Sequence, residues 1–404
     1  MQMLRLFAVM LLATLSLGSA VCGESRVNVL FRSGTSEVEE DRALVKSGAS
    51  KIKRLAAHGI VTANASGAAS LERLAQDANV EAVGADLLAV VISTDAPGAS
   101  GGKGGGPTPP PPAQVVPTGV RRISAYPTDT NSSSLAVRVA IVDTGIDLTH
   151  PDLAGNIVGN FNAILNRKTG QDDNGHGSHV AGTVAALDNS IGVVGVAPHA
   201  KLLAVKVLNS AGSGYLSDIS EGIDWAVANG AQVINMSLGY ASAPSVDPIK
   251  LALEKAAIAA VVVVCAAGNS GPASNSVNYP AKYMESIAVS AWNDVDGTSA
   301  DIDGAGADES LASFSSRGPE VYITAPGVNI LSTWRGGGTK TISGTSMASP
   351  HVAGAVARLL QAGRTTATSR EDLVATKEAV SGTLAEVGCG LVWVRAVPPP
   401  PPAP

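Results

Sequence analysis

The sequence predicts an α/β protein with a mainly parallel β-sheet, preceded by a smaller α+β domain. Residues 137–142 and 261–265 are dominated by valine, isoleucine and alanine, which is typical of strands buried on both faces of a parallel sheet. The runs 180–186 and 352–360 repeat apolar residues at helical spacing. Strand signals that alternate with helix signals in this way are typical of an α/β domain.

Composition sets limits on the class of protein. A chain of 404 residues is too long for one average domain and suits a large core plus a smaller unit. The net charge is −6 and no basic run occurs, which argues against a nucleic-acid partner. Three cysteines exclude an elaborate disulfide framework. We expect Cys265 to be a small core residue, and a bridge between Cys265 and Cys389 is left open.

The N-terminus has the pattern of a secretory signal peptide over residues 1–20. Arg5 precedes the apolar stretch 6–17, and small residues at 18–20 offer a cleavage site. About twelve apolar residues are too few for a good membrane span. We therefore expect a secreted product with no membrane association after signal removal. A lipoprotein anchored at Cys22 is the alternative, which the bulky Val21 disfavours.

Residues 21–95 form the predicted small domain. We expect a strand at 27–31 and helices at 38–47 and 71–77, followed by the stretch 80–86 and the apolar run 87–92. The order strand–helix–strand–strand–helix–strand indicates a ferredoxin-like α+β unit. A Gly/Pro-rich linker at 96–112 follows, then the main domain at 113–397 and a Pro-rich tail at 398–404.

Three segments carry residues suited to nucleophilic catalysis. Ser346 lies between a glycine turn and the helical run 352–360, where free N–H groups and the helix dipole favour a developing oxyanion. Asp143 ends the strand 137–142, at the edge where open α/β sheets bind ligands. His176 opens the helical run 180–186, so an orienting acid, a base and a nucleophile follow one another along the chain.

These segments, in the order Asp, His, Ser, resemble the subtilisin-like serine proteases, and the resemblance runs from about Ala113 to Val397. It implies a three-layer α/β fold and broad endopeptide hydrolysis through Asp143, His176 and Ser346. Asn269, after the strand 261–265, is implied as an oxyanion donor. Protein and peptide substrates and a monomeric enzyme are expected.

The small domain resembles the inhibitory prosegment of that family, particularly in the stretch DANVEAVGAD. The resemblance implies that the chain is made as a precursor whose own prosegment inhibits the active site. We expect self-processing between about Thr94 and Ala113, which leaves Gln114 on the mature enzyme.

Other enzyme classes fit less well. An aspartic protease would need a second Asp-Thr-Gly or Asp-Ser-Gly, which the sequence lacks. His176 and His179 are three apart with no Glu between them, unlike the zincin pattern, so His179 is expected to be structural. An esterase would carry Gly-x-Ser-x-Gly, and the segment around Ser346 lacks the second glycine. A catalytically silent peptide-binding relative remains the other alternative.

The resemblance also implies one structural Ca²⁺ and no catalytic cofactor. A polar turn at 187–193 follows the His176 helix, and hard oxygen ligands suit Ca²⁺. The implied ligands are the carbonyls of Leu187, Ile191 and Val193 and the side chains of Asn189, Asp152 and Gln114. We expect the acidic insertion 294–309 to be a solvated surface loop rather than a second ion site.

Substrate contacts are implied by the same resemblance. Two extended edges would pair with the substrate backbone, one formed by Gly212, Ser213 and Gly214, the other by Ser237, Leu238 and Gly239. The pocket for the fourth residue before the cut would be lined by Leu216, Ile219 and Leu238. Asn278 would lie near the floor of the primary pocket. We expect cleavage after apolar or medium-sized residues.

Overall fold

The computed structural model describes residues 24–94, 113–127, 136–164, 169–294, 296–298 and 308–394. They form two compact units: one contains the described residues up to Leu87 together with Ala243–Leu251, and the other contains the rest from Leu88 onward. The predicted signal peptide, the linker 96–112, the Pro-rich tail and most of the acidic insertion lie outside the described residues.

The N-terminal unit has the element order that the sequence predicted. Its elements are β1 (Glu24–Phe31), α2 (Glu37–Ser47), β2 (Ala49–Leu55), a 3₁₀ turn (Ala56–His58), β3 (Ile60–Ser66), α3 (Ala68–Gln76) and β4 (Val80–Ala85). The strands form an antiparallel sheet in the order β2-β3-β1-β4, as expected for a ferredoxin-like unit. A capping box between Ser36 and Glu39 begins α2, and Gly48 ends it in the left-handed region.

The segment Ala243–Leu251 packs into this N-terminal unit. The Ser245 hydroxyl donates to the carbonyl of Val83 at 3.0 Å. Val246 is buried in an apolar cluster with Leu55 and Ile60. A stretch of the predicted main domain therefore shares a small hydrophobic core with the predicted prosegment.

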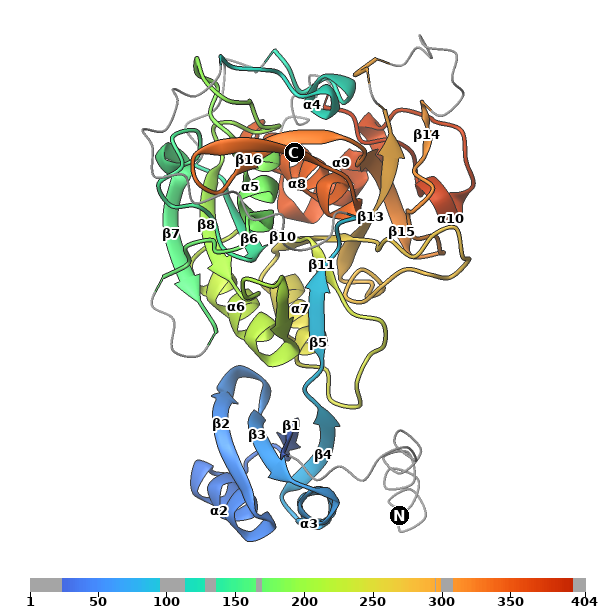
Figure 1. Cartoon of the computed structure of the whole chain (residues 1–404). Helices are drawn as coiled ribbons and strands as arrows, with labels where there is room; N and C mark the ends of the chain where they lie inside the picture. Colours follow the sequence, from blue (N-terminus) through green and yellow to red (C-terminus); the bar gives the residue numbers. More distant parts are fainter. Residues whose placement is uncertain are drawn as a thin grey trace, which may run out of the picture. The chain divides into compact units, whose positions relative to one another are not determined.

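The second unit contains the remaining elements (Figure 1). Its strands are β5 (Leu88–Val91), β6 (Arg138–Asp143), β7 (Ile157–Asn162), β8 (Lys201–Lys206), β9 (Ser213–Tyr215), β10 (Val233–Met236), β11 (Leu238–Gly239), β12 (Val262–Ala266), β13 (Ser286–Asn293), β14 (Ser310–Leu311), β15 (Val321–Pro326), β16 (Ile330–Trp334) and β17 (Gly338–Ile342). Its helices are α4 (Thr118–Arg122), α5 (His176–Ala185), α6 (Leu216–Ala228), α8 (Thr345–Gln361), α9 (Ser369–Thr376) and α10 (Leu384–Val387), with 3₁₀ turns at Ala154–Asn156 and Thr366–Thr368. Helix α7 (Pro248–Ile258) belongs to the first unit up to Leu251 and to the second unit from Ala252.

The central sheet runs β14-β13-β12-β10-β6-β8-β7, with β15 paired to β13, and all its pairs except β13–β14 are parallel. Every residue of β10 is buried, so both faces of the sheet are covered, because successive side chains point to opposite faces. Helix α8 packs on β10, β12 and β13, and α6 packs on β6, β7 and β8. The predicted three-layer α/β fold with a mainly parallel sheet is confirmed.

The topology places the site at the carboxyl end of the central strands. After β6 the chain adds β8 on one side and later β10 on the other, so the strand order reverses at β6. Ligands bind at such a reversal in open α/β sheets. Asp143 is the last residue of β6, and the loop after β12 carries Asn269.

Candidate active site

Asp143 and His176 form a buried pair. The Nδ1 atom of His176 lies 2.8 and 3.0 Å from the two carboxylate oxygens of Asp143. The backbone N–H of Thr144 also donates to Asp143 Oδ1, at 2.7 Å. Because the carboxylate is an acceptor, Nδ1 carries its proton toward Asp143 and Nε2 is left as the basic nitrogen. His176 Nε2 is buried and has no hydrogen-bond partner among the described residues.

A second buried carboxylate, Asp172, holds this pair in place. It accepts from the hydroxyls of Thr144 (2.9 Å) and Ser178 (2.6 Å) and from the backbone N–H groups of Asn174, Gly175 and Ser178. Burial raises the pKa of Asp172, opposed by these hydrogen bonds. The carboxylate therefore ties the residue after Asp143 to the first turn of α5, where His176 begins the helix.

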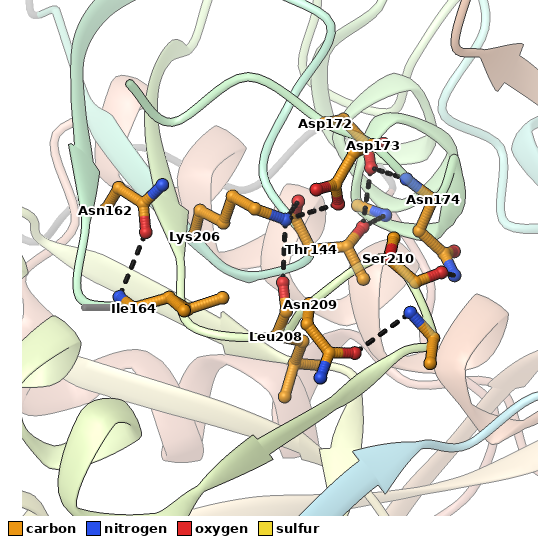
Figure 2. Close-up of polar contacts among 12 residues, drawn as sticks. Thr144, Asn162, Ile164, Asp172, Asp173, Asn174, Lys206, Leu208, Asn209 and Ser210 are labelled. Atoms are coloured by element: carbon orange, nitrogen blue, oxygen red, sulfur yellow. Dashed lines mark hydrogen bonds and ion pairs between the residues drawn. The ribbon is translucent and has the colours of Figure 1, made fainter. Parts of the chain in front are cut away.

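Lys206 adds an ionic contact to the same region (Figure 2). Its buried ammonium donates to the carbonyls of Thr144 (2.7 Å) and Leu208 (2.8 Å) and to the carboxylate of Asp173 (2.6 Å). Sequence reasoning missed both Asp172 and Lys206. The adjacent acids at 172–173, directly before a helix start, were the available signal, since acids are favoured there.

Ser346 is the second residue of α8 and is fully buried. Its backbone N–H donates to the carbonyl oxygen of Ile92 at 3.3 Å, and its hydroxyl donates to the carbonyl of Ser237 at 2.9 Å. The predicted nucleophile thus lies at a helix N-terminus, with its N–H directed at a peptide carbonyl of the chain itself.

Asn269 has the geometry of an oxyanion donor. Its Oδ1 accepts from the N–H (3.0 Å) and the hydroxyl (2.9 Å) of Thr345, which fixes the orientation of the amide. Its Nδ2 is buried and has no hydrogen-bond partner among the described residues. A Cβ added to Gly344 would lie 2.7 Å from Ile92 O and 3.2 Å from Asn269 Nδ2, so the two atoms approach the same point. Glycine at 344 leaves this space open.

The strand β5 lies between the two predicted substrate-binding edges. It pairs antiparallel with β9 on one side and with β11 on the other. Val91 donates to the carbonyl of Gly212 at 2.9 Å, and Ile92 donates to the carbonyl of Ser237 at 3.4 Å. The structure therefore brings Gly212, Ser213, Gly214, Ser237, Leu238 and Gly239 together around one extended segment of this chain.

Two of the predicted pocket residues, Leu238 and Asn278, lie beside the same segment. A Cβ added to Gly239 would meet Ile92 Cδ1 at 2.7 Å and Asn278 Cβ at 3.2 Å, so the Ile92 side chain lies near Asn278. Ile92 is only 6% exposed and Ala89 is fully buried. The three residues predicted for the more distant pocket are all buried, two in the first turn of α6 and one in β11: Leu216, Ile219 and Leu238.

All six predicted calcium ligands gather at the loop after α5. Gln114 Nε2 lies 3.3 Å from Leu187 O, and Asn189 Nδ2 lies 2.9 Å from Asp152 Oδ1. Asp152 Oδ2 accepts from Val193 N at 2.9 Å. The residue before Gln114 is bridged to Ile191. Burial raises the pKa of Asp152, opposed by these hydrogen bonds.

His179 is structural, as predicted. Its Nε2 contacts the carbonyls of Ile330 (3.0 Å) and Lys340 (3.1 Å) on neighbouring strands, and burial lowers its pKa to about 3. Cys265 and Cys389 are both free, so the bridge left open by the sequence is not formed. Cys265 is buried in β12, and burial raises its pKa to about 12.

The expectation of a solvated surface loop at 294–309 is wrong for two of the residues that the structure describes there. Asp294 is fully buried and Asp308 is 7% exposed. Asp294 lies 3.3 Å from the buried guanidinium of Arg122, which also pairs with Glu309. Burial raises the pKa of Asp294 to about 7. The contact with Arg122, distant in sequence, draws the ends of the insertion inward.

The comparison with protein families shows which family the chain belongs to. The model of the family described as the subtilase family matches residues 135–390. The chain belongs to the subtilase family. It is a serine endopeptidase that acts on proteins.

Curated relatives agree with this assignment. Subtilisin DY from Bacillus licheniformis is 47% identical over 251 residues, covering 61% of this chain and 85% of the relative. Subtilisin Savinase from Lederbergia lenta is 46% identical over 250 residues, covering 62% and 86%. A subtilisin from Bacillus pumilus is 43% identical over 289 residues, covering 70% and 99%.

Proposed function

We propose that this subtilase is a secreted endopeptidase, made as a self-processed precursor, that cuts peptide bonds through Asp143, His176 and Ser346. The observation that carries the proposal is the peptide carbonyl of Ile92 at Ser346 N, close to the Nδ2 of Asn269, which has no hydrogen-bond partner among the described residues. An extended peptide therefore lies at the start of α8, which is the arrangement acyl transfer needs.

The chemistry proceeds in two steps. The Ser346 hydroxyl leaves the carbonyl of Ser237, gives its proton to His176 Nε2, and attacks the substrate carbonyl carbon. His176 then gives the proton to the departing amine, and an acyl-enzyme remains. Water, deprotonated by His176, releases the acid and restores Ser346. Asp143 keeps the proton of His176 on Nδ1 and stabilises the imidazolium.

The oxyanion of each tetrahedral intermediate is held by the N–H of Ser346 and by Asn269 Nδ2. Both donors are fixed before the reaction, one by helix α8 and the other by Thr345. Donors that are already oriented need no reorganisation as negative charge develops.

Broad specificity follows from how the cleft holds a peptide. The edges formed by 212–214 and 237–239 bind backbone atoms, as they bind β5, and backbone pairing does not discriminate between sequences. The side chain of Ile92 in the primary pocket supports a preference for apolar or medium-sized residues.

The prosegment inhibits the enzyme by filling its cleft. Support comes from β5, which directly follows the N-terminal unit and lies on the substrate edges. The packing of Val246 in the core of the N-terminal unit is a second link between prosegment and protease. The signal peptide proposed at 1–20 directs secretion. No helix among the described residues is long and apolar enough to cross a membrane.

A structural Ca²⁺ fits the loop at 187–193. The amide nitrogens of Gln114 and Asn189 lie 3.3 and 2.9 Å from oxygens of Leu187 and Asp152. A half-turn of the Gln114 amide would direct its oxygen toward Leu187 O. Asn189 Oδ1 accepts from the N–H of Ile191 at 2.7 Å, and the Asn189 amide would have to give up this hydrogen bond to direct its oxygen toward Asp152. Oxygens at these separations can share one ion at roughly 2.3–2.6 Å. The carbonyls of Ile191 and Val193 complete the proposed ligands. The ion would stabilise the loop and take no part in the reaction.

The proposal is tested with the purified mature enzyme and a Ser346→Ala variant. Wild type should hydrolyse casein and be labelled at Ser346 by an organophosphonate probe, and the variant should do neither. Turnover of short-chain esters without casein hydrolysis would indicate an esterase. Absence of both activities and of labelling would indicate a protein that only binds peptides.

A further inference from the structure

We propose that the first bond cut in this precursor is Ile92–Ser93, so that the mature chain begins at Ser93 and initially keeps the Gly/Pro-rich linker. This inference rests on the self-processing proposed above and assigns it to one bond. The bond lies just before the range 94–113 expected from the sequence.

The residues on the N-terminal side of this bond are held in the register of a substrate. Ala89 and Val90 are paired with Gly214 and Ser213 on one edge, and Val90 and Val91 with Gly239 and Leu238 on the other. Ile92 then donates its N–H to Ser237 O at 3.4 Å. Its side chain is nearly buried, whereas Leu88 and Val90 are 51% exposed. The buried side chain therefore belongs to the residue whose carbonyl faces Ser346.

The carbonyl of Ile92 is the one presented to the oxyanion donors. It accepts from Ser346 N at 3.3 Å, and it shares with Asn269 Nδ2 the space left open by Gly344. A shift by one residue would turn this carbonyl away, because successive carbonyls of an extended chain point in opposite directions. The pairing of β5 thus selects one bond.

The residues after the bond are held as well. Thr94 donates its N–H to the carbonyl of Ser343 at 3.0 Å, and the hydroxyls of Thr94 (3.0 Å) and Ser93 (3.4 Å) reach the same oxygen. Ser343 lies two residues before the helix that carries Ser346. Contacts on both sides of the bond therefore hold the Ile92–Ser93 peptide beside Ser346, as a peptide about to be cut has to be held.

Cleavage of this bond needs water as its one co-reactant. Ser346 Oγ bonds to the Ile92 carbonyl carbon, and its proton passes through His176 Nε2 to the Ser93 nitrogen as the C–N bond breaks. Water then releases Ile92 as a carboxylate and Ser93 remains as a new amino terminus. The fragment that ends at Ile92 stays paired with β9 and β11 until it dissociates or is degraded.

The experiment follows the first cut in time. The chain without residues 1–20 is expressed in a protease-deficient host, with the slowed variant Asn269→Ala beside wild type so that the first products can be isolated. Intact mass and N-terminal sequencing should give one fragment that ends at Ile92 and one that begins at Ser93, before any trimming of the linker. Ser346→Ala should give neither fragment. First products that begin at Thr94 or beyond would overturn the assignment.

A proline pair supplies a matched control. Ser93→Pro places the ring nitrogen in the bond to be cut and restricts Ile92, and a misplacement of about 1 Å can cost roughly 10²-fold in rate. Processing of Ser93→Pro should therefore slow by at least about 10²-fold, whereas Ser100→Pro should mature at the wild-type rate. Equal rates for the two variants would reject the bond. Melting curves of the Ser93→Pro and Ser100→Pro variants, each combined with Ser346→Ala, test whether the precursor remains folded.

The outcomes of these experiments distinguish failure of the Ile92–Ser93 assignment from failure of the proposed endopeptidase function. A mature enzyme that hydrolyses casein and binds the phosphonate probe but was first cut elsewhere would leave the endopeptidase proposal intact and reject Ile92–Ser93. A folded precursor that neither cuts itself nor reacts with the probe would reject the endopeptidase proposal.

Discussion

Thr345→Val should impair catalysis by loosening Asn269 without touching the substrate. The Thr345 hydroxyl donates to Asn269 Oδ1 at 2.9 Å and accepts from Gly268 N at 3.1 Å. Valine has nearly the same shape but neither function, so the buried Gly268 N–H loses its acceptor and the Asn269 amide keeps only the N–H of Thr345. An unsatisfied buried N–H costs about 1–3 kcal/mol and a lost neutral hydrogen bond about 0.5–1.5 kcal/mol. The free energy of unfolding should therefore fall by roughly 1.5–4.5 kcal/mol.

The effect on rate should be smaller than removal of the donor itself. Loss of the corresponding asparagine costs about 10²–10³ in kcat, a figure measured in subtilisin. Because one of two anchors of Asn269 remains, we expect Thr345→Val to lower kcat about tenfold, or roughly 1.4 kcal/mol, with KM unchanged. Thr345→Ser keeps the hydroxyl and is the matched control.

The assay is hydrolysis of a chromogenic tetrapeptide with active-site titration, and urea unfolding of the phosphonate-inactivated enzymes. The reasoning is refuted if Thr345→Val retains the wild-type kcat, or if Thr345→Ser is impaired to the same degree.

Three further perturbations have definite expected results. Ser346→Ala should lower peptide hydrolysis by several orders of magnitude, as loss of the nucleophile costs about 2 × 10⁶ in kcat in subtilisin itself; retention of more than a few per cent of activity would exclude Ser346 as the nucleophile. EDTA should lower the melting temperature and speed autolysis, because an ion bound only by the native state stabilises that state. Asp152→Ala should have the same effect as EDTA. Equal melting curves with and without millimolar Ca²⁺ would count against the ion site. Acid should destabilise the inactivated enzyme. Burial lowers the pKa of His179 to about 3 and that of His351 to about 4 in the folded enzyme, whereas histidines of the unfolded chain have pKa values of about 6.5. Below about pH 6.5 the unfolded chain therefore binds more protons than the folded enzyme, and the free energy of unfolding falls. At pH 5 the loss should approach about 2 kcal/mol per histidine, and a His351→Gln variant with the same pH slope of unfolding as wild type would contradict this account.

The parts of the site that local sequence determines were predictable. A valine-rich strand that ends in Asp143 and a glycine turn before Ser346 specify a strand end and a helix start by short-range rules. The order of elements in the small domain followed from hydrophobic periodicity and turn residues in the same way. These features depend on residues that are close to one another in the sequence.

The parts that depend on distant contacts were not predictable. The acceptors of Lys206 include Thr144, which is far from it in sequence. The burial of Asp294 depends on Arg122, from an element near the start of the main domain. The register of β5 is set by β9 and β11, strands more than a hundred residues away. The short run Leu88–Val91 is apolar at every position, so its sequence does not fix which side chains face inward, and the pairing with β9 and β11 selects the register.

The docking of residues 113–115 on the loop 187–193, the proposed Ca²⁺ site, has a consequence for the order of maturation. Gln114 donates to Ser190 and Val115 to Gly192 in the same intact chain whose Ile92 faces Ser346. Residues 95–112 connect these two attachments, and a chain of that length reaches up to roughly 60 Å when extended. The proposed ligands of the ion can therefore assemble before the chain is cut, and the cut does not have to free Gln114 from the cleft. At the proposed Ca²⁺ site, the linker would therefore separate binding of the ion from the proposed activation, and we expect the Ser346→Ala precursor and the mature enzyme to bind the ion with the same affinity. Shortening the linker should couple the two events again.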